Sequence, residues 1–229
     1  MSTSILFHAF EAGDGWPIGS LVRVPADGGG AASPGVLAVP GSRHERDAWT
    51  HTALALVERG CTVMQIDVRG RGASANGVRY SEMGPAERRR VALDVAAAVS
   101  ELAHVAGVDA SRLGLLVEQD TAADAIEAVV SDSRVRGLAV LSARHPARVS
   151  AAVAGRGAPV YGMTSIEDRE GLRATVDAYL AAPQANSRID VFRGLGVGIT
   201  MASVLQFERP DERPIETRLA EWMASVLSS

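Results

Sequence analysis

A group of polar side chains stands directly after a strongly apolar run in the middle of the chain. Glu118, Gln119 and Asp120 follow this run, and Asp124 comes about one helical turn later. Carboxylates held close together can bind a cation or keep a proton at neutral pH. A predicted helix begins here, however, and the dipole of a helix favours negative charge at its start without any ligand. We therefore expect no metal site, and we expect Asp120 to cap the helix.

A second polar group occupies the turn over residues 42–47, after another apolar run. In this turn Arg43 can hold a carboxylate, and His44 can titrate near neutral pH. His145 follows a further predicted strand, which brings it to the same edge of a parallel sheet. Ligands of open α/β folds bind at that edge, so the sequence predicts a ligand pocket where these groups meet.

Length and composition exclude several classes of protein. The chain has 229 residues, 47% of them apolar, and we expect a single domain over residues 1–229. Its net charge is −4 and all 23 basic residues are arginine, without a large basic cluster, so we expect no nucleic-acid partner. The single Cys61 fits a reducing compartment. Since neither a signal peptide nor a membrane-spanning run is visible, we expect a cytoplasmic protein without a membrane partner.

Apolar periodicity places these residues on alternating strands and helices, the pattern of a mostly parallel sheet. An antiparallel pair over residues 4–11 and 17–25 comes first, followed by a loop over 26–34. The further predicted strands are 35–40, 62–68, 112–117, 135–142, 159–164 and 188–193. The predicted helices are 46–59, 85–106, 121–131, 167–181 and 214–227, with at most a short helix over 149–154.

Three stretches of the chain resemble the α/β-hydrolase family. Residues 36–42, VLAVPGS, look like the strand and oxyanion turn of that family, and residues 66–74, IDVRGRGAS, are similar to its Asp-x-Arg-Gly-x-Gly-x-Ser turn. Residues 107–114 resemble the approach to its nucleophile strand. The resemblance implies an α/β-hydrolase fold, with a mostly parallel central sheet and helices on both faces. Residues 142–159 leave no room for a helical lid, which implies the compact, lidless form.

The same resemblance implies where a catalytic triad would stand. The nucleophile position of the Gly-x-Ser-x-Gly elbow falls on Gln119, and the base position falls on Val197. The acid position falls on Glu167 or Ser165, with Asp168 also within reach. An amide is no useful nucleophile and valine cannot move a proton, so we expect no hydrolysis by a Ser-His-Asp triad.

The implied oxyanion hole is also altered. The backbone N–H of Ser42 can still donate on one side, whereas Pro40 replaces the histidine of the family's His-Gly turn. On the other side stands Asp120, whose carboxylate would oppose a developing negative charge. These changes further disfavour the family mechanism.

The sequence therefore favours a non-hydrolytic enzyme of the isomerase, epimerase or lyase type, acting on a small-molecule or peptide intermediate in the vestigial pocket. An inactive protein that binds a ligand or a protein partner is the alternative, and a hydrolase with a rearranged site is the least favoured. We expect no cofactor. The predicted pocket consists of Gly41, Ser42, Arg43, His44, Glu118, Gln119, Asp120, His145, Leu195 and Val197.

Overall fold

The computed structural model describes residues 3–26 and 32–228, and within them one eight-stranded sheet organises the chain. The strand order is β1-β2-β4-β3-β5-β6-β7-β8. The pairs β1·β2 and β2·β4 are antiparallel, and all other neighbours are parallel. The strands are β1 (Thr3–Glu11), β2 (Pro17–Pro25), β3 (Ser33–Val39), β4 (Thr62–Ile66), β5 (Val108–Glu118), β6 (Val135–Leu141), β7 (Val160–Ser165) and β8 (Arg188–Phe192).

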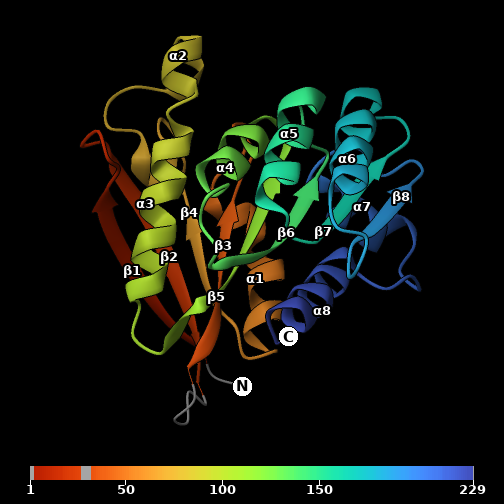
Figure 1. The fold of residues 1–229 in the computed structure, drawn as a ribbon, viewed down its shortest axis with the longest axis horizontal. Coiled ribbons are helices and arrows are strands. Elements are labelled where there is room, and N and C mark those ends of the chain that lie inside the picture. The colour runs from red at the N-terminus through yellow and green to blue at the C-terminus, as the bar shows by residue number, and fades with distance from the viewer. Residues whose placement is uncertain (1–2, 27–31, 229) are drawn as a thin grey trace.

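Helices cover both faces of this sheet (Figure 1). One layer contains α3 (Val91–His104), α4 (Ala122–Ala128), α5 (Pro146–Arg156) and α6 (Arg169–Ala181), preceded by the short α2 (Pro85–Arg88). The other layer contains α1 (Thr50–Val57), α7 (Thr200–Glu208) and α8 (Ile215–Ser228). The predicted fold class, a mostly parallel sheet between two helical layers, is confirmed.

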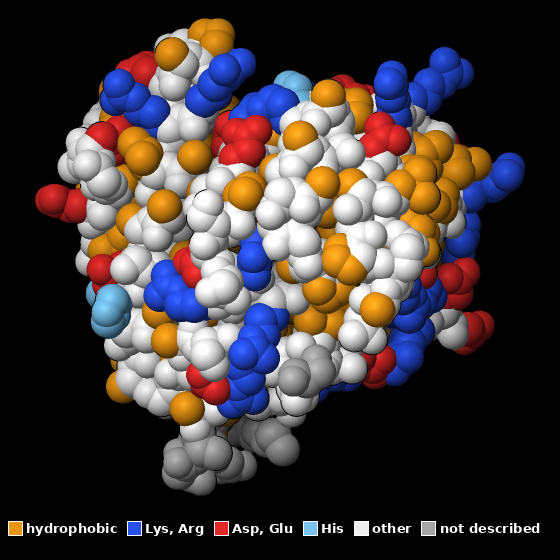
Figure 2. All heavy atoms as spheres, in the orientation of Figure 1, with side chains coloured by type: hydrophobic (Ala, Val, Ile, Leu, Met, Phe, Trp, Pro, Cys, Tyr) orange, Lys and Arg blue, Asp and Glu red, His pale blue; other side chains and the backbone are white. Residues whose placement is uncertain are grey.

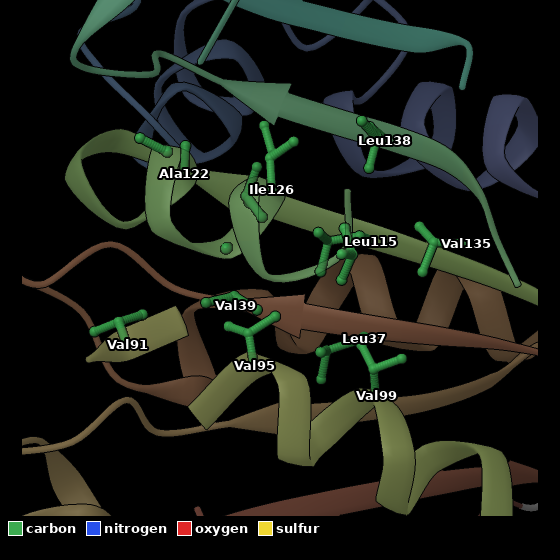
Figure 3. Packing of buried hydrophobic residues seen from close by; sticks show 14 of the residues in the cluster. Leu37, Val39, Val91, Val95, Val99, Leu115, Ala122, Ile126, Val135 and Leu138 are labelled. Atoms are coloured by element: carbon green, nitrogen blue, oxygen red, sulfur yellow. The ribbon is translucent and has the colours of Figure 1, made fainter. Parts of the chain in front are cut away.

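The central strand β5 shows why the sequence forms this architecture. Leu115 packs into the core on one face of the sheet and Leu116 into the core on the other. A strand that is covered on both faces needs a continuous apolar run, and β5 has one from Leu113 to Val117. In Figure 3, Val95 and Val99 of α3 point toward the sheet residues on the Leu115 side. The two cores fix the direction of β5 and therefore the position of its polar end.

The predicted long helix over residues 85–106 is wrong, because the chain forms α2 and α3 with an interruption at Arg89 and Arg90. Only α3 has an apolar stripe against the sheet, formed by residues such as Val91 and Val95. No residue of α2 is buried, so this turn lacks the packing that would extend α3 backwards. The expected loop over 26–34 is only partly testable: residues 27–31 lie outside the described part, and Ser33 already belongs to β3.

Two helices differ more strongly from the prediction. The helix α5 has 11 residues rather than the short helix expected over 149–154. Its ends carry signals that explain the difference: Pro146 occupies its first turn, and Gly157 ends it in the left-handed conformation. The helix α7 was not predicted at all, because only Met201, Ala202 and Leu205 are buried along it.

The surface of the described residues carries charges of both signs. Figure 2 shows arginine and carboxylate side chains next to one another on the visible face. Within the same residues, none of the helices combines the length and the apolar character needed to cross a lipid bilayer.

Truncation of the central strand tests the packing described above. We expect Leu115→Ala to lower the free energy of unfolding by about 2–5 kcal/mol, because it leaves a cavity between the sheet and α3. The control is Leu180→Ala, since Leu180 is 66% exposed and its loss should change stability by about 0.5 kcal/mol or less. Urea unfolding followed by circular dichroism measures both. Similar losses for the two variants would contradict the assignment of β5 to the core.

Candidate functional site

The polar end of β5 turns sharply into α4 through a 3-10 turn over Gln119–Thr121. At this point Gln119 has a φ of +51°, in the left-handed region that side chains other than glycine rarely adopt. Gln119 is 7% exposed, and its carbonyl accepts a hydrogen bond from Arg144 N at 3.0 Å. The backbone thus makes the strand-to-helix turn of a nucleophile elbow without the two glycines that usually permit it.

Glu118 connects the two loops that flank this turn. Its Oε1 accepts hydrogen bonds from Gly41 N at 3.0 Å and from His44 Nδ1 at 2.7 Å, both in the loop after β3. Its Oε2 accepts one from Ile199 N at 2.7 Å, in the loop before α7. The Glu118 side chain is fully buried, so these donors take the place of water around the carboxylate.

Gly198 shows how closely the second loop approaches the elbow. A Cβ on Gly198 would lie 2.5 Å from Gln119 Nε2 and 2.5 Å from Glu118 Oε2. The residue also has a φ of +58°, which a side chain would strain. A side chain at this position would therefore press against the Gln119 amide and the Glu118 carboxylate as well as strain the backbone.

His44 is held in the manner of a catalytic base. A carboxylate can only accept, so Nδ1 carries the proton in the bond to Glu118. This hydrogen bond raises the pKa of His44 above its usual 6.5, although partial burial opposes the shift. The other ring nitrogen, Nε2, has no hydrogen-bond partner within the described residues. The His44 side chain is 23% exposed, so a reacting group can approach that nitrogen.

A cavity of about 200 Å³ opens beside His44. It lies between the first turns of α1, α7 and α8. The apolar part of its lining comes from Ala48, Ile199 and Ala202. Its polar lining comes from His44, His51, Thr52, Thr200, Ser203 and Glu216.

Asp120 does not cap the helix, and that prediction is wrong. The residue at the N-cap of α4 is Thr121, which makes no side-chain capping bond, while its Oγ1 donates to Pro40 O at 2.8 Å. Asp120 instead turns toward the loop after β3, where its Oδ1 accepts from Ser42 N at 3.0 Å. The N–H that was expected to remain for an oxyanion is therefore occupied by a carboxylate.

Only three of the ten residues predicted for the pocket line the cavities described here, and they are divided between two of them. Asp120 and His145 line a second cavity of about 300 Å³, together with Tyr80, Asp124 and several arginines. There Asp124 forms an ion pair with Arg148 at 2.5 Å, while burial raises the pKa of the Asp124 carboxyl group. The lining of this cavity does not include His44. Asp120 and His145 thus line a different cavity from His44, although Asp120 is near enough to contribute to the raised pKa of His44.

The remaining predicted residues lie around the loop after β8. Leu195 and Val197 both belong to this loop. The Leu195 side chain is buried in the core, and Val197 is partly buried next to Gly198. Glu167 Oε2 accepts hydrogen bonds from Gly194 N at 2.8 Å and from the Ser165 hydroxyl. The Ser165 hydrogen bond lowers the pKa of Glu167.

The positions implied for the triad therefore lie around the loop after β8. Glu167 accepts a hydrogen bond from Gly194 at the start of this loop, and Glu118 accepts one from Ile199 at its end. Arg43 lies apart from this arrangement, on the exposed side of the loop after β3. Neither of the two cavities described above has Gln119 or Val197 in its lining.

Several residues of the His44 cavity were not found from the sequence. Ser203 lies on α7, which was not predicted, and Thr52 is a buried residue of α1 that no motif singled out. Glu216 directly follows the buried Ile215 at the start of α8. In the described ranges, no group of three or more histidine, cysteine or carboxylate side chains is arranged to hold a metal ion.

No family model and no curated protein matches this sequence. Among solved structures, a dienelactone hydrolase from Anabaena variabilis has a TM-score of 0.75 and 16% identity, with 100% of this chain and 98% of that chain covered. The esterase domain of a Rhodothermus marinus protein has a TM-score of 0.72 and 14% identity, with coverage of 99% and 100%. An acetyl xylan esterase from a Paenibacillus species has a TM-score of 0.70 and 18% identity, with coverage of 90% and 83%.

These similarities correct the function expected from the sequence. The expectation of a non-hydrolytic or inactive protein is overturned, because the similar structures are hydrolases and esterases. Likeness at such low identity establishes the fold alone, so the reaction of this chain is a matter for proposal. The expected lidless form agrees with the structure, because α5 begins shortly after β6 ends. The chain has the α/β-hydrolase fold.

Proposed function

We propose that the protein is a hydrolase of small esters in which His44 is the base and Glu118 positions it. The observation that carries the proposal is the 2.7 Å hydrogen bond between His44 Nδ1 and the buried Glu118 carboxylate, beside a cavity. A carboxylate that orients a histidine and stabilises its protonated form is the arrangement that hydrolases use to activate a nucleophile. The similarity to hydrolase and esterase structures supports the same class of reaction.

In this proposal the triad at the family positions is degenerate, and the chemistry has moved to the loop after β3. Gln119 and Val197 supply neither a nucleophile nor a base, so water is the attacking group. The Nε2 atom of His44 accepts a proton from this water while the water oxygen bonds to the ester carbonyl carbon. When the bond to the leaving alcohol breaks, His44 returns the proton to the alcohol oxygen. An acid and an alcohol result, and His44 is neutral again.

The developing negative charge needs a donor, and Thr52 is suited to provide it. Thr52 is one of the residues around the cavity, and its buried Oγ1 has no hydrogen-bond partner among the described residues. A buried hydroxyl without a partner is unfavourable, and a substrate carbonyl oxygen would satisfy it. In this role the Thr52 hydroxyl replaces the Ser42 N–H, which Asp120 occupies.

Substitution of the base tests the assignment. We expect His44→Gln to lower kcat/KM for para-nitrophenyl acetate by about 10²–10⁴-fold, because glutamine can bond to Glu118 but cannot take up a proton. The matched control is His8→Gln, since His8 also pairs with a carboxylate, Glu101, but on the exposed surface at 3.1 Å. Stopped-assay rates at several ester concentrations give kcat and KM for each protein.

Full activity in His44→Gln would contradict the proposal.

A second readout identifies the nucleophile. With water as the attacking group, a fluorophosphonate should leave no adduct in an intact mass spectrum. An adduct on Ser203, which lines the cavity, would make that hydroxyl the nucleophile instead.

The pH dependence tests the role of Glu118. A base works in its neutral form, so kcat/KM should rise as pH increases through the pKa of His44, which the Glu118 hydrogen bond raises above 6.5. In Glu118→Gln this charge is removed, and the rise should move to lower pH while the maximal rate falls. Glu101→Gln, at the exposed His8 pair, should leave the profile unchanged. If Glu118→Gln lowered the rate without moving the profile, Glu118 would have only a structural role.

A further inference from the structure

The walls of the His44 cavity are unusual in their charge. Arginine is the only basic residue type besides histidine in this chain, and none of the residues described as lining the cavity is an arginine. Glu216 contributes the one carboxylate found among the residues described as lining the cavity. The described lining of this cavity therefore contains one carboxylate and no arginine.

Glu216 is also free to bind a ligand. Most carboxylates near the cavities are engaged, as Glu118 is with His44 and Asp124 is with Arg148. Within the described part of the chain, Glu216 makes neither a hydrogen bond nor an ion pair. Glu216 lies in the first turn of α8, where the helix dipole favours a negative charge. Its carboxylate therefore needs no arginine beside it and can accept a hydrogen bond from a ligand.

A second, independent feature of the cavity also points to a ligand. The Oγ1 atom of Thr52 is fully buried and has no hydrogen-bond partner within the part of the chain that the structure describes. Thr52 comes from α1 and Glu216 from α8, so the cavity has an unmet donor and an unmet acceptor on two different helices. A ligand with a carbonyl group at one end and a positive charge near it would satisfy both.

We propose that the substrate of this site is a small ester whose acyl group carries an ammonium group, bound by the Glu216 carboxylate. This proposal rests on the hydrolysis proposed above. The carbonyl group lies against the Thr52 hydroxyl and the Nε2 atom of His44, and the ammonium group donates to Glu216. A cavity of about 200 Å³ is below the usual size of drug-like sites, so the acyl group is about as large as a small amino acid.

Two esters of equal shape provide the test. L-Alanine ethyl ester and ethyl isobutyrate differ in having an ammonium group or a methyl group on the same carbon. We expect kcat/KM at neutral pH to favour the alanine ester by about tenfold or more, as a charged hydrogen bond allows. In Glu216→Gln this preference should fall by about tenfold or more, to the ratio that the intrinsic reactivities of the two esters give, while hydrolysis of ethyl isobutyrate continues. Glu208→Gln, at the exposed end of α7, is the matched control and should keep the preference.

A binding experiment separates this proposal from the proposed hydrolysis. The probes are L-alaninamide and isobutyramide, titrated by calorimetry into His44→Gln, which cannot turn over a substrate by the proposed route. Tighter binding of L-alaninamide, lost when Glu216→Gln is added, would support cation recognition even if no ester were hydrolysed. Hydrolysis of both esters at equal rates by the wild-type protein, with equal binding of both amides, would overturn cation recognition and leave the hydrolase proposal standing.

Discussion

The arrangement of the site depends on one buried carboxylate. Glu118 ends the central strand β5, which packs against helices on both faces and cannot easily move. From this fixed point it accepts hydrogen bonds from Gly41, His44 and Ile199. A buried carboxylate without its donors would be strongly unfavourable, so the two loops are held as long as the strand is folded. The position of His44 is therefore set by the sheet, although His44 itself lies in a loop.

The same interaction explains why the cavity forms where it does. Ile199 directly precedes α7, and its N–H is held by Glu118. This bond places the first turn of α7 opposite α1, and the residues Thr52 and Ser203 line the space between them. The next N–H of the loop after β3, that of Ser42, donates to Asp120, which also lines the second cavity. Glu118 and Asp120 thus bind consecutive backbone N–H groups of the loop after β3, and of the two only Asp120 also lines the second cavity.

Much of this could be predicted from local pattern, and the reasons for the failures are specific. The strands have apolar runs or alternation that the sequence shows directly, and the position of Gln119 at the strand-to-helix turn follows from them. The partners of Glu118 are 74 to 81 residues away in sequence, so no local pattern indicates them. Asp120 was assigned to the nearest helix for the same reason, although a distant backbone N–H binds it. The helix α7 lacks a continuous apolar stripe, and with it the lining residue Ser203 was missed.

The left-handed conformation of Gln119 has a consequence for how such chains are identified. A non-glycine residue in that conformation costs about 1–3 kcal/mol, and the surrounding packing maintains it here although the residue has no serine hydroxyl to present. The turn is therefore a property of the junction between β5 and α4, independent of the chemistry at its tip. A search that requires the residues Gly-x-Ser-x-Gly would pass over this chain. A search for one positive φ angle between a buried parallel strand and a helix would retrieve it.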